Sequence, residues 1–252
     1  MPLISVSGTQ CVGKTTFIKD FLAQWPMYST ADKTYRDVIK SEKLKINKET
    51  TQESQRLILE AIVEDIKSAK KRDFILFDRS PIDNLVYSLW AYEKNVGNID
   101  DGFVADCIKI VRQTIQKLDV MFLIPLTNHH EIKIVEDGLR ETDPIYRQEI
   151  NELFQGLKRK REAGDDVFFV KDDSPPFIEI FGDRESRIAM CQLYIREDGS
   201  FYGEEESMLL DSNGDYITGN SDDIIDTGER DQLREALGLQ KDNLYRKDKY
   251  EI

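Results

Sequence analysis

The sequence has few of the residues that stabilise secreted proteins or bind structural metals. It contains three cysteines, Cys11, Cys107 and Cys191, and two histidines among 252 residues. Three scattered cysteines are too few for a disulfide framework, and no paired Cys and His spacing predicts a zinc site. This low content favours a protein of the reducing cytoplasm.

Long apolar runs are also lacking. No run approaches the roughly 20 residues needed to cross a bilayer, so the sequence predicts no membrane span. The first residues lack the basic start of a signal peptide. With 40% hydrophobic and 10% aromatic residues, the chain can still bury a sizeable core. We therefore expect a globular cytoplasmic protein with one main domain.

The chain has fewer basic than acidic residues, and most of this difference lies in its C-terminal part. The net charge is -13, of which residues 197–252 contribute -10 through 16 acidic and 6 basic residues. An acidic surface disfavours non-specific binding to DNA. We predict a main domain over residues 1–196 and a small acidic C-terminal appendage over 197–252, in which turn-rich stretches predict hairpins.

A glycine-containing loop near the start carries the clearest functional signal. It fits the complete Walker A spacing, and it lies between an apolar run over 3–7 and an amphipathic stretch over 17–24. In this P-loop motif, backbone N–H groups and the N-terminus of the following helix bind phosphate oxygens. The residues assigned to nucleotide binding are Gly8, Thr9, Gln10, Cys11, Val12, Gly13, Lys14, Thr15 and Thr16.

Two side chains of this loop have distinct expected roles. Lys14 is expected to contact the outer phosphates during catalysis, and the Thr15 hydroxyl to bind Mg²⁺. The predicted cofactors are therefore ATP and Mg²⁺. A catalytic thiol at Cys11 is disfavoured, because the middle positions of such loops tolerate many side chains.

Three further short apolar runs lie at 74–77, 120–124 and 167–170, and helical patterns separate them, notably over 52–68 and 103–118. Strands that alternate with helices predict an α/β fold with a parallel sheet and right-handed crossovers. In such sheets, ligands bind at the carboxyl ends of the strands, where the P-loop and Asp78 are expected.

A second block begins where the run 74–77 ends. Asp78 at a strand tip beside the P-loop can bind Mg²⁺ or accept a proton from an attacking hydroxyl, and Arg79 can hold a phosphate. Asp83 is assigned to substrate binding. The structural alternative is that Ser80 caps a helix, Pro81 begins it and Asp83 favours its dipole. Both interpretations can hold together.

A third block supplies candidate catalytic arginines. Gly138 lies between acidic and basic residues, with Arg140 and Arg147 around a turn, which is typical of a lid that closes over a phosphate. The alternative is that these arginines are solvated on a polar helix face. Weaker signals assign the acceptor substrate to Arg36, Gln52 and Gln55, each of which also has an ordinary surface explanation.

Together the blocks resemble the P-loop kinases grouped with the nicotinamide riboside kinase domain of NadR, near the deoxynucleoside and thymidylate kinases. The resemblance covers residues 1 to about 196 and rests on 8–16, 77–87, 137–140 and 182–188.

That resemblance implies a three-layer P-loop NTPase sandwich with five parallel strands and a lid after the fourth. It also implies an adenine-binding turn near 171–176 and a carboxylate at Asp78 that acts on the acceptor. The sequence departs from NadR because no nucleotidyltransferase domain precedes the P-loop and an acidic appendage follows. The resemblance therefore does not imply that this chain shares the nicotinamide substrate of NadR.

Three functions are consistent with these features. The first is a kinase for a small nucleoside or nucleotide acceptor, either as a monomer or as a homodimer. The second is a kinase for a polynucleotide or a hydroxymethylated base in DNA, which predicts a basic groove and steep salt dependence. The third is a regulatory ATPase whose bound nucleotide orders a surface for a protein partner.

Overall fold

The computed structural model describes residues 2–31, 35–70, 74–127, 141–170 and 173–202. All of them belong to one compact unit, Met1–Ser207. A second unit, Met208–Ile252, lies outside the described residues, and so do any hairpins after residue 202. The division of the chain at residue 196 stays a prediction.

The chain alternates strands with helices, as the sequence predicts. Its elements are β1 (Leu3–Ser7), α1 (Lys14–Gln24), α2 (Tyr35–Ser41), the short 3-10 helix η1 (Asn47–Glu49), α3 (Gln52–Ser68), β2 (Ile75–Asp78), α4 (Pro81–Glu93), α5 (Asp101–Ile115), β3 (Val120–Leu123), α6 (Pro144–Glu162), β4 (Phe177–Glu179) and α7 (Arg184–Gln192).

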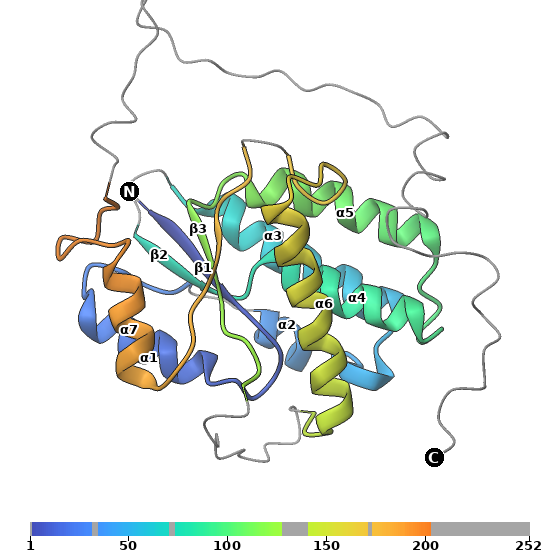
Figure 1. The fold of residues 1–252 in the computed structure, drawn as a ribbon. Coiled ribbons are helices and arrows are strands. Elements are labelled where there is room, and N and C mark those ends of the chain that lie inside the picture. The colour runs from blue at the N-terminus through green and yellow to red at the C-terminus, as the bar shows by residue number, and fades with distance from the viewer. Residues whose placement is uncertain (1, 32–34, 71–73, 128–140, 171–172, 203–252) are drawn as a thin grey trace, which may run out of the picture. The chain divides into compact units, whose positions relative to one another are not determined.

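The strands form one parallel sheet in the order β2-β1-β3-β4. Figure 1 shows α1 and α7 on one side of this sheet and α3, α4 and α5 on the other. This three-layer arrangement confirms the predicted α/β class. None of the helices in the described residues is long and apolar enough to cross a membrane.

The described sheet has four strands rather than the five that were expected. Beyond β2, Ser29 makes one isolated parallel bridge with Ile75, and its carbonyl accepts the N–H of Leu76 at 2.9 Å. Ser29 and Thr30 are both exposed, so this segment lacks the buried positions that would extend the pairing. Beyond β2 the sheet is thus extended by a single bridge and not by a further strand.

The apolar run 167–170 is not a strand, so that prediction is wrong. The carboxylate of Asp165 accepts two backbone N–H groups of the run, at 2.9 and 3.4 Å, and the Ser174 hydroxyl accepts a third at 2.9 Å. Side chains therefore bind the N–H groups that a neighbouring strand would need. The last strand is instead β4, which begins directly after Pro175 and Pro176.

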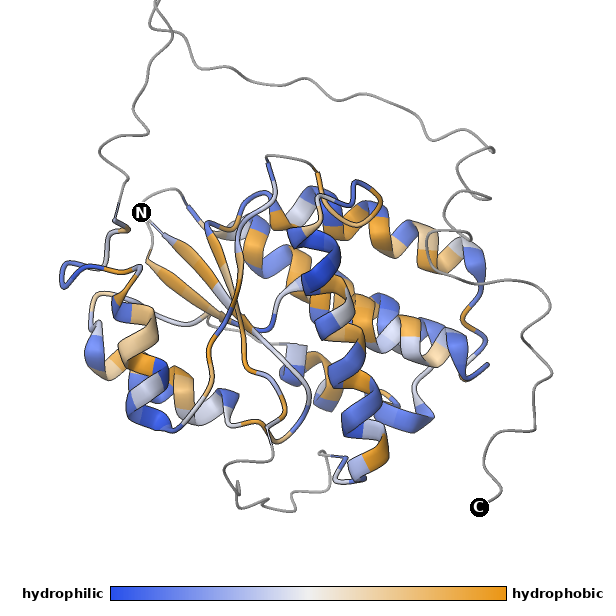
Figure 2. Ribbon diagram, in the orientation of Figure 1, coloured by the Kyte–Doolittle hydropathy of each residue, from blue (hydrophilic) through white to orange (hydrophobic). Residues whose placement is uncertain are grey.

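An aromatic core fastens α1 to the sheet. The Phe21 ring lies 4.6 Å from that of Trp25 and 5.1 Å from that of Tyr28, measured between ring centroids. Figure 2 shows largely hydrophobic strands and helices in which hydrophobic and hydrophilic residues alternate. Each buried aromatic ring contributes about 2–3 kcal/mol through its removal from water. Phe17, one turn earlier on α1, packs edge-on against Phe122 of β3 at 6.3 Å between ring centroids, so this core holds α1 against the sheet.

The chain after α7 forms a small antiparallel hairpin, in which Ile195 bridges Phe201. The Trp25 indole N–H donates to the carbonyl of Arg196 at 2.8 Å, and the Tyr28 hydroxyl donates to the carbonyl of Gly199 at 2.7 Å. Residues 197–202, although assigned by sequence to the appendage, therefore pack on the residues that follow α1.

Candidate phosphate-binding and catalytic site

The loop between β1 and α1 follows a backbone path that glycine makes accessible. Its φ angle is positive at Gly8 (141°), Cys11 (57°) and Gly13 (89°). A Cβ atom on Gly8 would lie 2.4 Å from the carbonyl oxygen of Ile124, so a side chain cannot be accommodated there. The loop thus passes close to the end of β3 and delivers the chain to α1.

The N-terminus of α1 is open to an anion. Gly13 is the N-cap and supplies no side-chain hydrogen bond, and the first turn contains no acidic residue. The first backbone bond runs from the N–H of Phe17 to the carbonyl of Gly13 at 2.9 Å. The N–H groups of the first turn therefore have no partner within the helix, and together with the helix dipole they favour phosphate.

Lys14 is folded back into the loop. Its side chain is 6% exposed, and its Nζ donates to the carbonyls of Gly8 at 2.5 Å and Thr9 at 2.6 Å. Burial, and then the positive charge of Arg79, lower the pKa of Lys14 to about 7. Thr15, on the same turn, has an exposed side chain.

Two arginines distant in sequence hold the remainder of the loop. Arg147 on α6 donates from Nε to the carbonyl of Gln10 at 3.1 Å and from Nη2 to that of Cys11 at 3.3 Å. Arg187 on α7 donates from Nη1 to the carbonyl of Val12 at 2.9 Å. With the two bonds of Lys14, each carbonyl from Gly8 to Val12 accepts a hydrogen bond from a cationic side chain.

The side chain of Gln10 connects the loop to two other segments. Its Nε2 donates to Oδ1 of Asn47 in η1, and its Oε1 accepts the backbone N–H of Glu141 at 2.5 Å. Glu141 is the first described residue after the predicted lid, whereas Gly138 and Arg140 lie outside the described residues. The loop is therefore linked to the segment that follows the lid sequence.

Asp78 lies beside the P-loop because β2 pairs with β1, where it is in register with Val6. Its Oδ2 forms an ion pair with Nη2 of Arg36 at 3.1 Å. Its Oδ1 is buried and accepts no hydrogen bond from the described residues. A carboxylate oxygen in this state is available to a ligand, because buried polar atoms normally have a partner.

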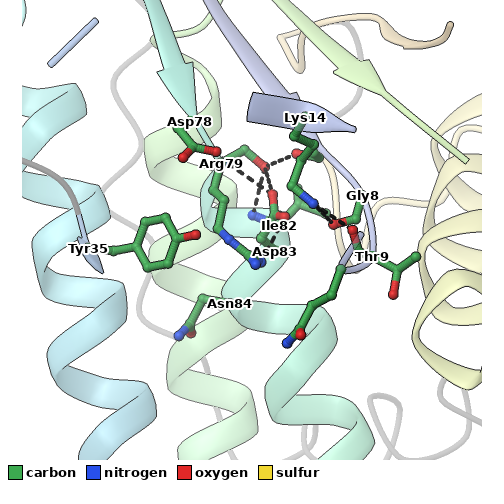
Figure 3. Close-up of polar contacts among 12 residues, drawn as sticks. Gly8, Thr9, Lys14, Tyr35, Asp78, Arg79, Ile82, Asp83 and Asn84 are labelled. Carbon is green, nitrogen blue, oxygen red and sulfur yellow. Dashed lines mark hydrogen bonds and ion pairs between the residues drawn. The ribbon is translucent and has the colours of Figure 1, made fainter. Parts of the chain in front are cut away.

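Arg79 follows with a positive φ of 96°. Its guanidinium lies between two aromatic rings, with its central carbon 4.9 Å from the centroid of Tyr35 and 5.0 Å from that of Tyr87. Nη1 also contacts Oδ1 of Asp83 at 3.2 Å. Figure 3 shows Arg79 between Tyr35 and Asp83, next to Asp78. The side chain is thus held by both cation–π contacts and an ion pair.

Asp83 stabilises the start of α4, which is the structural alternative that the sequence offered for it. It is fully buried, and its Oδ2 accepts the N–H of Ser80 at 3.0 Å, while the Ser80 hydroxyl accepts the N–H of Ile82 at 3.1 Å. This is a capping box at the start of α4. Because its other oxygen binds Arg79, Asp83 positions that arginine as well.

The two predicted glutamines lie at the start of α3. The N–H of Gln52 donates to the carbonyl of Gly97 at 2.9 Å. Gln55 is 4% exposed, and its Nε2 donates to Oγ1 of Thr50 at 2.7 Å. Its Oε1 accepts from Nδ2 of Asn84 at 2.7 Å. Gln55 therefore connects α3 to α4, a role that an isolated glutamine in a sequence does not reveal.

The structure brings most of the predicted residues into one site. Lys14 is within electrostatic reach of Arg79, Asp83, Asp78 and Arg36. Three further side chains belong to this site: Arg187, Asn84 and Tyr35. Tyr35 precedes Arg36 and is predicted with it on the acceptor side, whereas Asn84 and Arg187 lie in the blocks 77–87 and 182–188 without an assigned role. What each of the three contacts is seen only in the folded chain.

A protein-family model described as an AAA domain matches residues 3–173. The match spans more than half of the 252 residues, so the chain belongs to this AAA-domain family. No curated protein matches the chain.

Solved structures identify the fold more narrowly as that of P-loop kinases. Deoxyadenosine kinase from M. mycoides with bound dATP is 17% identical, with a TM-score of 0.53, over 75% of this chain and 96% of that chain. Thymidylate kinase from Candida albicans is 12% identical, with a TM-score of 0.52, over 76% of this chain and 89% of that chain.

A third similar structure is the NadR protein in complex with NR, at 14% identity and a TM-score of 0.47. The match covers 72% of this chain but 44% of the NadR chain, so this chain spans less than half the length of that protein.

Proposed function

We propose that this chain is a kinase that transfers the terminal phosphate of ATP to a small nucleoside or nucleotide. One observation carries the proposal: a phosphate loop and a carboxylate with an unpartnered oxygen, Asp78, follow neighbouring strands at one edge of the sheet. A kinase needs both groups side by side, one for the donor and one for the acceptor. The similar kinases act on a deoxynucleoside and a nucleotide according to their names, which supports the acceptor class.

The loop residues fit a nucleotide triphosphate. The uncapped N-terminus of α1 gives phosphate oxygens access to backbone N–H groups. Lys14 would exchange its bonds to two loop carbonyls for bonds to phosphate oxygens. The residues proposed to hold ATP are those of Gly8–Thr16.

The residues also fit Mg²⁺, which prefers oxygen ligands and retains several waters. Thr15 would hold it directly and Asp78 through one of its bound waters, and among the described residues no cluster of three or more His, Cys, Asp or Glu competes for a metal. Bound Mg²⁺ would neutralise charge on the transferred phosphate.

The acceptor is proposed to lie against Asp78, where the carboxylate accepts the proton of the attacking hydroxyl while Arg36 holds its other oxygen. Arg79 and Arg147, together with Arg140, are proposed to stabilise charge on the phosphoryl group. Gln52 and Gln55 are proposed on the acceptor side. The three cysteines are free thiols, which agrees with the proposed cytoplasmic location.

Labelled ATP tested with the full chain against nucleosides, monophosphates and DNA with hydroxymethylated bases separates the three functions. Transfer to a nucleoside or monophosphate, lost in Lys14→Met, supports the proposal. Transfer to DNA alone shows the polynucleotide kinase. Hydrolysis that no acceptor accelerates shows the regulatory ATPase, and a chain that does not bind Mg-ATP rules out all three.

A further inference from the structure

Arg187 reaches the phosphate loop from the opposite end of the described chain. Its side chain is 8% exposed, and its Nη1 donates to the carbonyl of Val12 at 2.9 Å. It lies on α7, which packs against α1 on the face of the sheet away from α3, α4 and α5 (Figure 1). Arg187 therefore contacts the phosphate loop from the α7 side of the sheet.

The geometry of the peptide unit gives this contact a consequence in front of the loop. The carbonyl of Val12 and the N–H of Gly13 belong to one planar trans peptide, so they point in opposite directions. A donor that holds the carbonyl on the α7 side also directs the N–H of Gly13 to the other side. Gly13 is the N-cap of α1, at φ 89°, so this same peptide sets the entry into the helix.

Packing alone does not explain an arginine at this position. A buried guanidinium loses much of its hydration, and an apolar side chain of similar volume is often at least as stabilising. Here Nη1 faces a neutral carbonyl, the Asp183 carboxylate offsets part of the charge, and Nε is buried and donates no hydrogen bond to the described residues. What arginine adds over an apolar residue is a directional donor to Val12.

We propose that Arg187 is a positioning residue, which fixes the Val12–Gly13 peptide so that its N–H and the first turn of α1 face the nucleotide phosphates. This inference rests on the proposed binding of ATP. Arg187 would act through the loop and would not touch the nucleotide.

The same helix offers a matched control. Arg184 is 72% exposed at its side chain and pairs with Asp20 of α1, with Nε and Nη2 at 2.9 and 2.5 Å from the two carboxylate oxygens. Arg184→Met thus removes an arginine bond between α7 and α1 without changing any contact to the loop. Arg187→Met removes the bond to Val12.

The test is the affinity of the full chain for Mg-ATP, measured by calorimetry beside thermal unfolding of each variant. Loss of a charge-assisted hydrogen bond predicts about ten-fold weaker binding or more for Arg187→Met. Arg184→Met should bind within about two-fold of the unaltered chain, as expected for an exposed ion pair. Arg187→Lys, which keeps one charged donor, should recover part of the affinity, and the KM for the acceptor should be unchanged in all three.

Equal affinity of Arg187→Met and the unaltered chain would overturn the inference, and so would an equal loss in Arg184→Met, which would indicate general docking of α7. If Arg187→Met does not fold, Arg187→Gln takes its place with the same expectation, since its shorter amide is polar but uncharged. Absence of Mg-ATP binding by the unaltered chain would instead overturn the proposed function, and this inference with it.

Discussion

The loop after β1 and the turn after β2 lie at the same edge of the sheet, yet they are formed by different means. The first loop uses its backbone: its glycines take positive φ angles, and its carbonyls are held by Lys14, Arg147 and Arg187. The second uses side chains: Asp78 pairs with Arg36, and Arg79 lies between two tyrosine rings. The same edge thus presents a site formed by main-chain groups beside a site formed by side chains.

This difference matches the two tasks of a kinase. Phosphate groups of a nucleotide are the same whatever the acceptor, so backbone N–H groups suffice to bind them. An acceptor varies in shape, and side chains can be exchanged without rebuilding the strand that carries them. The two loops should therefore fail in different ways when they are altered.

The largest expected effect lies on the side-chain turn. Asp78→Asn removes the proposed base and should lower the turnover number by about 10²- to 10⁴-fold. Binding of Mg-ATP should change far less, because the phosphate loop is unaltered. Single-turnover kinetics and calorimetry together check this. The control is Asp106→Asn, at an exposed position on α5. If the turnover number of Asp78→Asn stays within about three-fold of that of the unaltered chain, the assignment of Asp78 as the base is wrong.

The next effect lies on the backbone loop. Gly8→Ala places a Cβ 2.4 Å from the carbonyl of Ile124, so the loop must shift. The strain of about 2–3 kcal/mol should weaken Mg-ATP binding by about 100-fold. Gly164→Ala is the control, because Gly164 has φ 73° and no atom within 4 Å of its added Cβ. It should cost about 1 kcal/mol of unfolding free energy and leave the nucleotide affinity unchanged.

The loop was predictable from sequence because its function depends on the spacing of a few local residues. The turn after β2 was predictable in part: Asp78 and Arg79 were identified, but the partners that hold them, Tyr35 and Tyr87, are brought close by α2 and α4. The run 167–170 was misread because side-chain acceptors, which hydrophobic pattern does not show, bind its N–H groups. Arg187 lies within the block 182–188, but it is 175 residues from Val12, so no local pattern could reveal the contact between them.

The smallest expected effect concerns the charge of Lys14. Its pKa of about 7 without ligand lies below its ordinary value of 10.5, so the lysine is mostly neutral above pH 7 and must gain a proton to bind phosphate. Affinity for Mg-ATP should therefore fall by up to about ten-fold between about pH 7 and about pH 8. In the unliganded protein, burying charged Lys14 lowers the free energy of unfolding. This destabilisation is complete below about pH 7 and disappears as the pH rises toward the ordinary lysine pKa of 10.5. Lys14→Met should therefore raise the free energy of unfolding most at low pH.

Calorimetry in two buffers of different ionisation enthalpy measures the proton uptake directly. At about pH 8.5 the terminal phosphate is already fully ionised, because its second pKa is near 6. An uptake close to one proton is then expected from Lys14, and none at about pH 6, where the lysine is already charged. Zero uptake at the higher pH would show that the lysine stays charged in the unliganded loop.

The hairpin that Trp25 and Tyr28 contact sets a limit on how far the chain can be shortened. A polypeptide that stops after Arg196 would keep the acceptor of the indole N–H but lose Gly199, whose carbonyl accepts the Tyr28 hydroxyl. Loss of this hydrogen bond costs about 0.5–1.5 kcal/mol, so a chain that stops after Arg196 should have a lower thermal midpoint than one that stops after Tyr202, which keeps the Gly199 acceptor.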